Sequence, residues 1–266
     1  VFKINLCEGT VDNILKNLTK RALPIYELIR QRVGQSPVVG GDETGVKING
    51  IKGWLFTFQT QVLTFLTVSY SRGFETIQTL FNNGFPVSVY VTDCWAAQLK
   101  TVAKAHQICL AHLQRELNNF MDAFNCQWSL QMKQLLLQAI ELKRQLQPND
   151  YLKEDERVKF LETQLDLLLK TDLDTKNKKV QAFIKRLNKN RHAIFTFLYH
   201  LKVPPDNNAS ERAIRNAKVK MKVSNQFKIL DGAKRFAVLR SVIDTTIKNS
   251  QNVLQALAAL VNLAPE

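Results

Sequence analysis

Cysteine is scarce in this sequence of 266 residues, and its four cysteines, Cys7, Cys94, Cys109 and Cys126, form no C-x-x-C motif. A disulfide framework is therefore not expected, and a reducing cytoplasm is the simpler interpretation. Long apolar runs are also lacking, since none approaches the roughly 20 residues of a membrane helix. No signal peptide is recognisable. We expect a cytoplasmic protein without a membrane partner.

Acidic residues are too few to balance the basic ones. Lys and Arg number 37 against 23 Asp and Glu, which gives a formal net charge of +14. This excess favours a polyanionic partner, because each phosphate that a protein neutralises releases counterions. Only Asp231 opposes the basic residues between positions 212 and 240, which are Arg212, Arg215, Lys218, Lys220, Lys222, Lys228, Lys234, Arg235 and Arg240. We expect this segment to contact phosphates, although a basic surface without such a partner stays open.

Glycine is absent between residues 116 and 200. Apolar residues recur there at helical spacing over residues 128–147, 156–171 and 178–201, which predicts successive helices. The chain therefore carries a predicted all-helical insertion subdomain at residues 116–202.

The segments around this insertion have a different pattern. Residues 11–33 predict a helix that Pro24 should kink or split, within an N-terminal helical segment at residues 1–36. Short runs rich in β-branched and aromatic residues follow over 38–48, 53–61 and 62–70, and they predict a three-stranded antiparallel meander.

Further strands and helices complete a predicted split core. A fourth strand is expected over 87–93, a helix over 95–105 and a fifth strand over 106–112. The core, at residues 37–115 and 203–266, is then of the α/β class, with a five-stranded sheet flanked by helices.

Three acids are candidates for chemistry. Asp42 lies on the first predicted strand, Asp93 ends the fourth, and Glu211 lies on a helix after the insertion. Ligands gather at the carboxyl ends of strands in open α/β sheets, and Mg²⁺ prefers carboxylate oxygens. Two such ions about 3.5 to 4 Å apart can activate an attacking oxygen and stabilise a leaving one. We expect the three carboxylates to bind two Mg²⁺ (or Mn²⁺) ions for phosphodiester chemistry.

Each acid also has a structural alternative. Asp42, in the string GGDETG, fits a turn, and the neighbouring Glu43 competes for any role. Asp93 fits the N-cap of the helix that follows, and Glu211 fits a capping box with Asn208. Residue type and spacing leave these alternatives open.

A resemblance adds to this interpretation. The strings GGDETG, VTDCWAAQ, CLAHLQREL and DNNASERAIR, followed by GAKRFAVLRSVIDTTIKNSQNVLQAL, resemble in this order the transposases of the insertion sequence 66 family. The resemblance spans nearly the whole chain. It implies an RNase H-like catalytic core with a helical insertion before the last acid, and it assigns the catalytic and metal-binding roles to Asp42, Asp93 and Glu211.

The same resemblance implies a function and its setting. The expected activity is a DDE transposase, an endonuclease that cuts at transposon ends and joins them to target DNA by transesterification. Homo-oligomers on DNA, accessory transposition proteins and a bacterial, nucleoid-associated location are further expectations. Full-length relatives carry an upstream DNA-binding region that is not seen here, and the sequence lacks an initiating methionine, so we expect that an N-terminal portion is missing.

Other candidate residues lie near the acids. Cys109 and His112 form C-x-x-H, but His106, His192 and His200 offer no second close pair for a four-ligand zinc site. Related transposase groups carry a similar element after the second acid, which implies that His112 lies near the active site or the DNA. The expected DNA contacts are His112, Arg115, Arg212, Arg215, Lys218, Lys220, Lys222, Lys234 and Arg235. Asn207 and Asn208, about one turn before Glu211, are expected to orient its carboxylate or a metal-bound water.

Two rival functions remain. One is a nuclease of the RNase H superfamily, such as a junction resolvase, which would cleave without joining. The other is a non-catalytic, domesticated transposase that acts as a DNA-binding protein.

Overall fold

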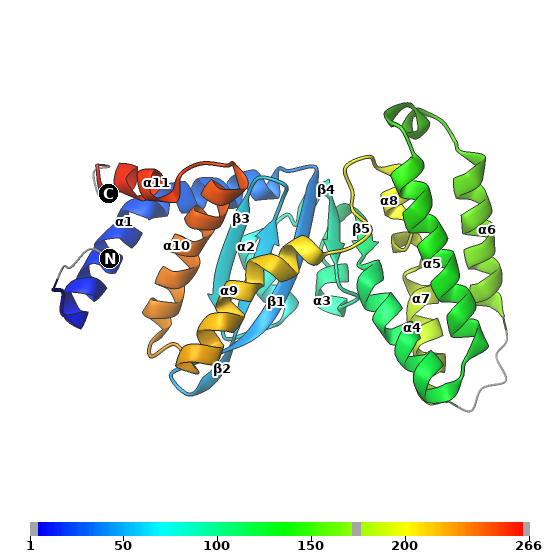
Figure 1. Ribbon diagram of the computed structural model, residues 1–266, viewed down its shortest axis with the longest axis horizontal. Coiled ribbons are helices and arrows are strands. Elements are labelled where there is room, and N and C mark those ends of the chain that lie inside the picture. The colour runs from blue at the N-terminus through cyan, green and yellow to red at the C-terminus, as the bar shows by residue number, and fades with distance from the viewer. Residues whose placement is uncertain (1–4, 172–176, 263–266) are drawn as a thin grey trace. The chain divides into compact units, whose positions relative to one another are not determined.

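The computed structural model describes residues 5–171 and 177–262. The chain divides into two compact units, one of Val1–Ser88, Lys100–Val102 and Asn208–Glu266, the other of Val89–Leu99 and Ala103–Asn207. Its five-stranded sheet has the order β3-β2-β1-β4-β5 (Figure 1). This mixed sheet with flanking helices confirms the predicted α/β, RNase H-like fold.

Strands β1 (Val38–Ile48), β2 (Ile51–Gln59) and β3 (Thr64–Ser69) form the predicted antiparallel meander. Asn49 and Gly50, with φ of 47° and 76°, make the two-residue turn between β1 and β2. Positive φ at both positions is what a tight hairpin turn requires.

The hairpin register sorts the side chains of the meander onto two faces. On one face, Phe58 meets Phe81 at the end of α2 (Phe74–Leu80), with ring centroids 4.9 Å apart. Phe85, at the start of β4 (Phe85–Thr92), lies 4.7 Å from Phe81. The opposite face carries a cluster of buried aliphatic side chains, which helices from the C-terminal part of the chain cover.

Besides α2, the described part of this first unit contains the helices α1 (Glu8–Gly34), α9 (Asn208–Ser224), α10 (Leu230–Lys248) and α11 (Val253–Val261). Helix α1 runs through Pro24 without a break, so a split at this residue was a wrong expectation. Buried Ala22 and Tyr26 lie on either side of the proline and hold both halves against the core.

The second unit contains the end of β4, the short helix α3 (Ala96–Leu99) and β5 (Ala103–Ile108). The predicted helix over 95–105 is therefore wrong in its second half, and the fifth strand starts and ends earlier than predicted. Helix propensity in the sequence AAQLKTVAKA is a weak preference, and pairing within the sheet overrides it.

Long helices form the rest of this unit (Figure 1). They are α4 (Leu110–Phe124), α5 (Gln127–Gln145), α6 (Glu156–Lys170) and α7 (Lys178–Lys189), with short turns at Pro148–Leu152 and Arg191–Ala193 and a last short helix α8 (Thr196–Tyr199). The prediction of a single helix over 178–201 is wrong, because helix α7 ends at Lys189 and two short helical segments follow it. Arg191 holds the break, since its guanidinium pairs with Asp166 at 2.6 Å and Glu162 at 3.0 Å.

Across residues 5–171 and 177–262, no helix is both long enough and apolar enough to cross a membrane.

Candidate active site

Asp42 and Glu43 are neighbouring acids on β1 whose side chains point to opposite faces of the sheet. The Glu43 side chain is only 4% exposed, and its Oε1 accepts hydrogen bonds from Arg72 at 2.6 and 2.9 Å. Asp42 lies inside the strand, which excludes the turn alternative, and its Oδ1 accepts from the backbone N–H of Glu43 at 2.8 Å. The register therefore separates the two acids, because Glu43 is engaged in an ion pair on the other face.

Thr57 of β2 stands directly opposite Asp42 in the hairpin register. Its side chain is fully buried, and within the described residues its hydroxyl has no hydrogen-bond partner. Burying an unpaired hydroxyl is costly, so this group is a candidate for positioning a ligand beside Asp42. Sequence reasoning missed Thr57, although the dipeptide Asn49–Gly50 favours a two-residue hairpin turn, and the register of such a hairpin places Thr57 opposite Asp42.

Glu211 lies in the first turn of α9, three residues after Asn208. Ile214 belongs to the buried cluster that includes Val46 and Ile48 of β1, so Glu211, on the same side of the helix, faces the sheet. Beyond the helix, Phe227 forms a parallel bridge with Ile48, which fixes the C-terminal end of α9 at the hairpin end of β1 (Figure 1).

This anchor sets where Glu211 lies along β1. A helical rise of about 1.5 Å per residue puts Glu211 about 20 Å before Ser224. A strand rise of about 3.3 Å per residue puts Asp42 about 20 Å before Ile48. Both acids therefore lie toward the same end of β1, on the facing surfaces of the strand and of α9.

The basic residues expected to contact DNA differ in their surroundings. Those exposed on the first unit are Arg212, Arg215, Lys218, Lys222 and Lys234. Lys220 is half-buried, with its Nζ 5.2 Å from the centre of the Phe227 ring. Arg235 is 14% exposed and pairs with Asp12 at 2.7 Å and Asp231 at 3.1 Å. Its guanidinium therefore joins α10 to α1 rather than standing ready for phosphate.

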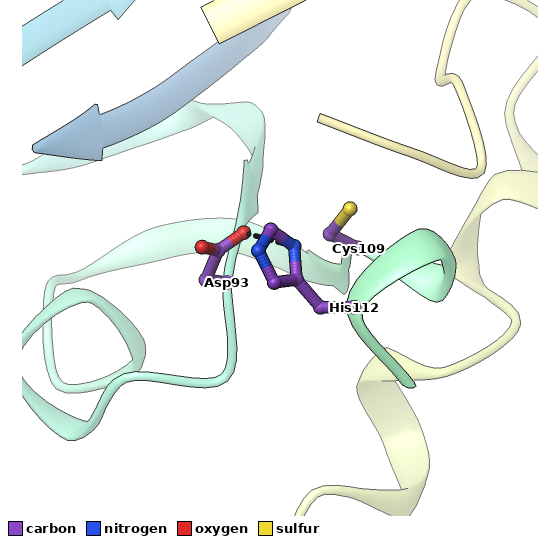
Figure 2. A group of neighbouring side chains, drawn as sticks. All are labelled: Asp93, Cys109 and His112. Carbon is purple, nitrogen blue, oxygen red and sulfur yellow. Dashed lines mark ion pairs between the residues drawn. The ribbon is translucent and has the colours of Figure 1, made fainter. Parts of the chain in front are cut away.

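Asp93 follows directly after β4, and its carboxylate meets the imidazole of His112 (Figure 2). The Asp93 Oδ1 and His112 Nδ1 atoms are 2.9 Å apart, and the side chains are 28% and 31% exposed. The carboxylate, followed by the Cys109 thiol, raises the pKa of His112 to about 10, against the opposing effect of burial. The carboxylate thus has an imidazole partner, which the alternative of a helix N-cap does not explain.

The residues around this pair are positioned by α4. Cys109 is the N-cap residue of α4 and is buried, and its backbone N–H donates to the Thr92 carbonyl at 2.8 Å. The backbone N–H of Asn207 donates to the Cys109 Sγ at 3.2 Å. Exposed Arg115, one turn after His112, has its Nη1 3.2 Å from the imidazole Nε2. Asp93, His112 and Arg115 thus lie close together within one unit.

The acids fit a Mg²⁺ or Mn²⁺ site by their chemistry. Asp42, Asp93 and Glu211 offer only carboxylate oxygens, the ligand type that these hard cations prefer. Asp42 and Glu211 belong to the first unit and Asp93 belongs to the second.

Comparison with known proteins identifies a family for this sequence. A family model described as "Transposase IS66 family" matches residues 1–235. The matched stretch includes all three acids, the C-x-x-H element and the helical segment between them. No curated protein matches the sequence.

Proposed function

The chain belongs to the IS66 family of transposases, and on this premise we propose that it cleaves DNA strands at the ends of an insertion sequence and joins them to target DNA. The proposal rests chiefly on the family match over residues 1–235. The placement of Asp42 and Glu211 on facing surfaces, with Glu43 turned away and paired, agrees with it.

In this proposal Asp42, Asp93 and Glu211 are the catalytic residues. Together they would hold two Mg²⁺ or Mn²⁺ ions, which supply activation of the attacking oxygen and stabilisation of the leaving one. The protein itself contributes concentrated negative charge, a buried hydroxyl at Thr57 and an imidazole beside Asp93.

DNA is the proposed partner, and electrostatic contact is the proposed mode of binding. The exposed side chains of Arg212 and Arg215 follow Glu211 on α9, so they would border the phosphate that reacts. Arginine suits this role because its planar guanidinium donates two parallel hydrogen bonds to phosphate oxygens. Homo-oligomers on DNA and accessory transposition proteins remain predictions.

Cleavage and joining can be measured on DNA that carries the terminal sequences flanking the gene. We expect Asp42→Asn, Asp93→Asn and Glu211→Gln each to reduce both steps by at least about 10³-fold, since each removes a charge on which the reaction depends. DNA affinity should be unchanged or higher, because negative charge has been removed.

Glu43→Gln is the matched control, because it neutralises the acid next to Asp42. It should lower stability by about 1–3 kcal/mol, through loss of the charged hydrogen bonds to Arg72, and keep the strand-transfer rate. Cleavage without joining of pre-cut ends would indicate a plain nuclease. An inert wild-type protein that still binds DNA would indicate the non-catalytic alternative.

A further inference from the structure

Asp93, Cys109 and His112 form a cluster (Figure 2). Its thiol and its imidazole are groups that the proposed Mg²⁺ site does not need. Each offers one ligand atom, and these oxygen, sulfur and nitrogen atoms all lie within 4.8 Å of one another. We propose that this cluster is a three-ligand site for a borderline-soft transition metal such as Zn²⁺, and that occupancy withdraws Asp93 from catalysis.

The backbone around the start of α4 and the end of β4 holds the three side chains of the cluster close together. The backbone bond from Cys109 N–H to the Thr92 carbonyl holds the start of α4 against the end of β4, where Asp93 follows. His112 lies three residues after Cys109, so both side chains project from the same side of the first turn. All of these residues belong to the second unit.

The ligand types favour zinc over magnesium. Thiolate and imidazole are ligands for Zn²⁺, whereas Mg²⁺ selects oxygen. The Asn207 N–H donates to Cys109 Sγ at 3.2 Å, a contact that stabilises negative charge on sulfur. With bonds of about 2.0 to 2.3 Å, ligand atoms around one zinc ion lie about 3 to 4 Å apart. The present separations therefore require only small side-chain shifts.

The exposure of the cluster and its number of ligands also agree with a zinc site that keeps one open position. The Asp93 and His112 side chains are 28% and 31% exposed, so an ion can reach the cluster from that side, whereas Cys109 is buried behind them. Three protein ligands leave a fourth position for water, which separates this site from a closed, four-ligand structural zinc site. With Nδ1 bound to metal, Nε2 carries the proton, so the exposed Arg115 must turn away from it.

The inhibitory part of this inference rests on the proposed function, because only there does Asp93 hold catalytic Mg²⁺. One carboxylate cannot serve both sites fully, so the two metals compete. The metal-binding part stands on the cluster alone and can be tested without DNA.

Co²⁺ titrated into the whole chain is a suitable probe, because thiolate coordination gives a charge-transfer band and tetrahedral coordination gives strong visible absorption. We expect both signals for the wild type. Cys109→Ser should lose the charge-transfer band, and His112→Gln should weaken binding by at least about tenfold, the loss seen even for outer partners of a metal. Because His112 is partly exposed, its replacement serves if the buried Cys109 variant does not fold.

Cys126→Ser is the matched control, since Cys126 is the N-cap of α5 as Cys109 is of α4, but lies outside the cluster. It should keep both signals. Absence of the charge-transfer band in the wild type, or its loss in Cys126→Ser instead of Cys109→Ser, would overturn the site.

A second measurement tests the competition. Zn²⁺ should inhibit Mg²⁺-dependent cleavage by the wild type, and Cys109→Ser should require at least about tenfold more Zn²⁺ for the same fractional inhibition. Equal sensitivity of the two proteins would overturn the inhibitory role. If no cleavage occurs at all but cobalt binds as expected, the proposed function fails and the metal site stands.

Discussion

At the scale of single residues, Thr57 has a buried hydroxyl without a hydrogen-bond partner among the described residues, and this unfavourable burial calls for an explanation. It lies opposite Asp42 with no partner among the described residues, and an unpaired buried hydroxyl destabilises a protein by about 1–3 kcal/mol. Thr57→Val keeps the shape and removes that cost. We expect it to raise the free energy of unfolding by about 1 kcal/mol and to slow strand cleavage, as measured by denaturant unfolding and cleavage assays.

Thr64 provides a control for this prediction. It is also a buried threonine on the same face without a partner for its hydroxyl in the described chain, but its register partner is Gln59 rather than Asp42. Thr64→Val should therefore give the same gain in stability with an unchanged cleavage rate. If Thr57→Val cleaves DNA as fast as the wild type, Thr57 has no positioning role.

The sequence could nominate the three acids as candidates but not every side chain that surrounds them. Asp42 and Glu43 are both acids in one short string, so the sequence alone does not decide which of them is the site residue. The structure distinguishes them, because successive strand residues point to opposite faces and Glu43 is paired with Arg72. The contact between Asp93 and His112 joins residues from different elements, and no local spacing predicts the distance between them. Cys109 seemed to lack a second ligand pair for zinc because Asp93 was considered only as a ligand for Mg²⁺.

At the scale of elements, a lysine secures the end of α10. The Lys248 Nζ donates to the Gln59 Oε1 at 2.8 Å, the Thr60 carbonyl at 2.7 Å and the Leu63 carbonyl at 2.9 Å. These acceptors lie at the end of β2 and in the loop to β3, so one ammonium group ties the last helical turn to the meander. A cation at this helix end also interacts favourably with the helix dipole.

The burial of Lys248 predicts a pH dependence of stability. Burial lowers the pKa of Lys248 from 10.5 to about 8. Between these values the unfolded chain keeps a proton that the folded chain has lost, so the free energy of unfolding rises with pH. The cost of the buried charge is thus fully present below the folded pKa and absent above the unfolded pKa. Lys143 of α5 acts in the same direction, because burial lowers its pKa to about 8.

Denaturant unfolding at about pH 7.5 and about pH 9.5 checks this prediction. The wild type should gain stability between the two values, and Lys248→Met should gain less. Lys16→Met, on an exposed position of α1, should gain as much as the wild type. An equal gain in Lys248→Met would mean that Lys248 keeps its ordinary pKa.

The elements themselves show where sequence patterns suffice. The meander was predictable because alternating strand residues and an Asn–Gly turn specify a hairpin locally. The structure of segment 95–105 was not predictable from local pattern. Its alanines favour a helix, whereas residues 103–108 form strand β5 of the sheet. The break after α7 also depends on distant partners, since Glu162 and Asp166 on α6 hold Arg191.

At the scale of the whole molecule, only part of the excess positive charge is available to neutralise DNA phosphates. Some of the cations are used internally, as the ion pairs of Arg235 and the stacked position of Lys220 show. Others, including Lys218 and Lys222, are exposed on α9 beyond Glu211. The formal charge of +14 therefore overstates the number of side chains that are ready to neutralise phosphates.

This distinction predicts which lysines set the salt dependence of DNA binding. Lys218→Gln combined with Lys222→Gln should reduce the slope of log affinity against log salt by up to about 2, because each phosphate contact releases about 0.9 counterion on duplex DNA. Lys16→Gln combined with Lys20→Gln removes the same charge at the same spacing from an exposed stretch of α1. That pair should leave the slope nearly unchanged, since long-range charge is screened within about 10 Å at 0.1 M salt. Equal effects of the two pairs, measured by fluorescence anisotropy across salt concentrations, would show that net charge rather than α9 governs binding.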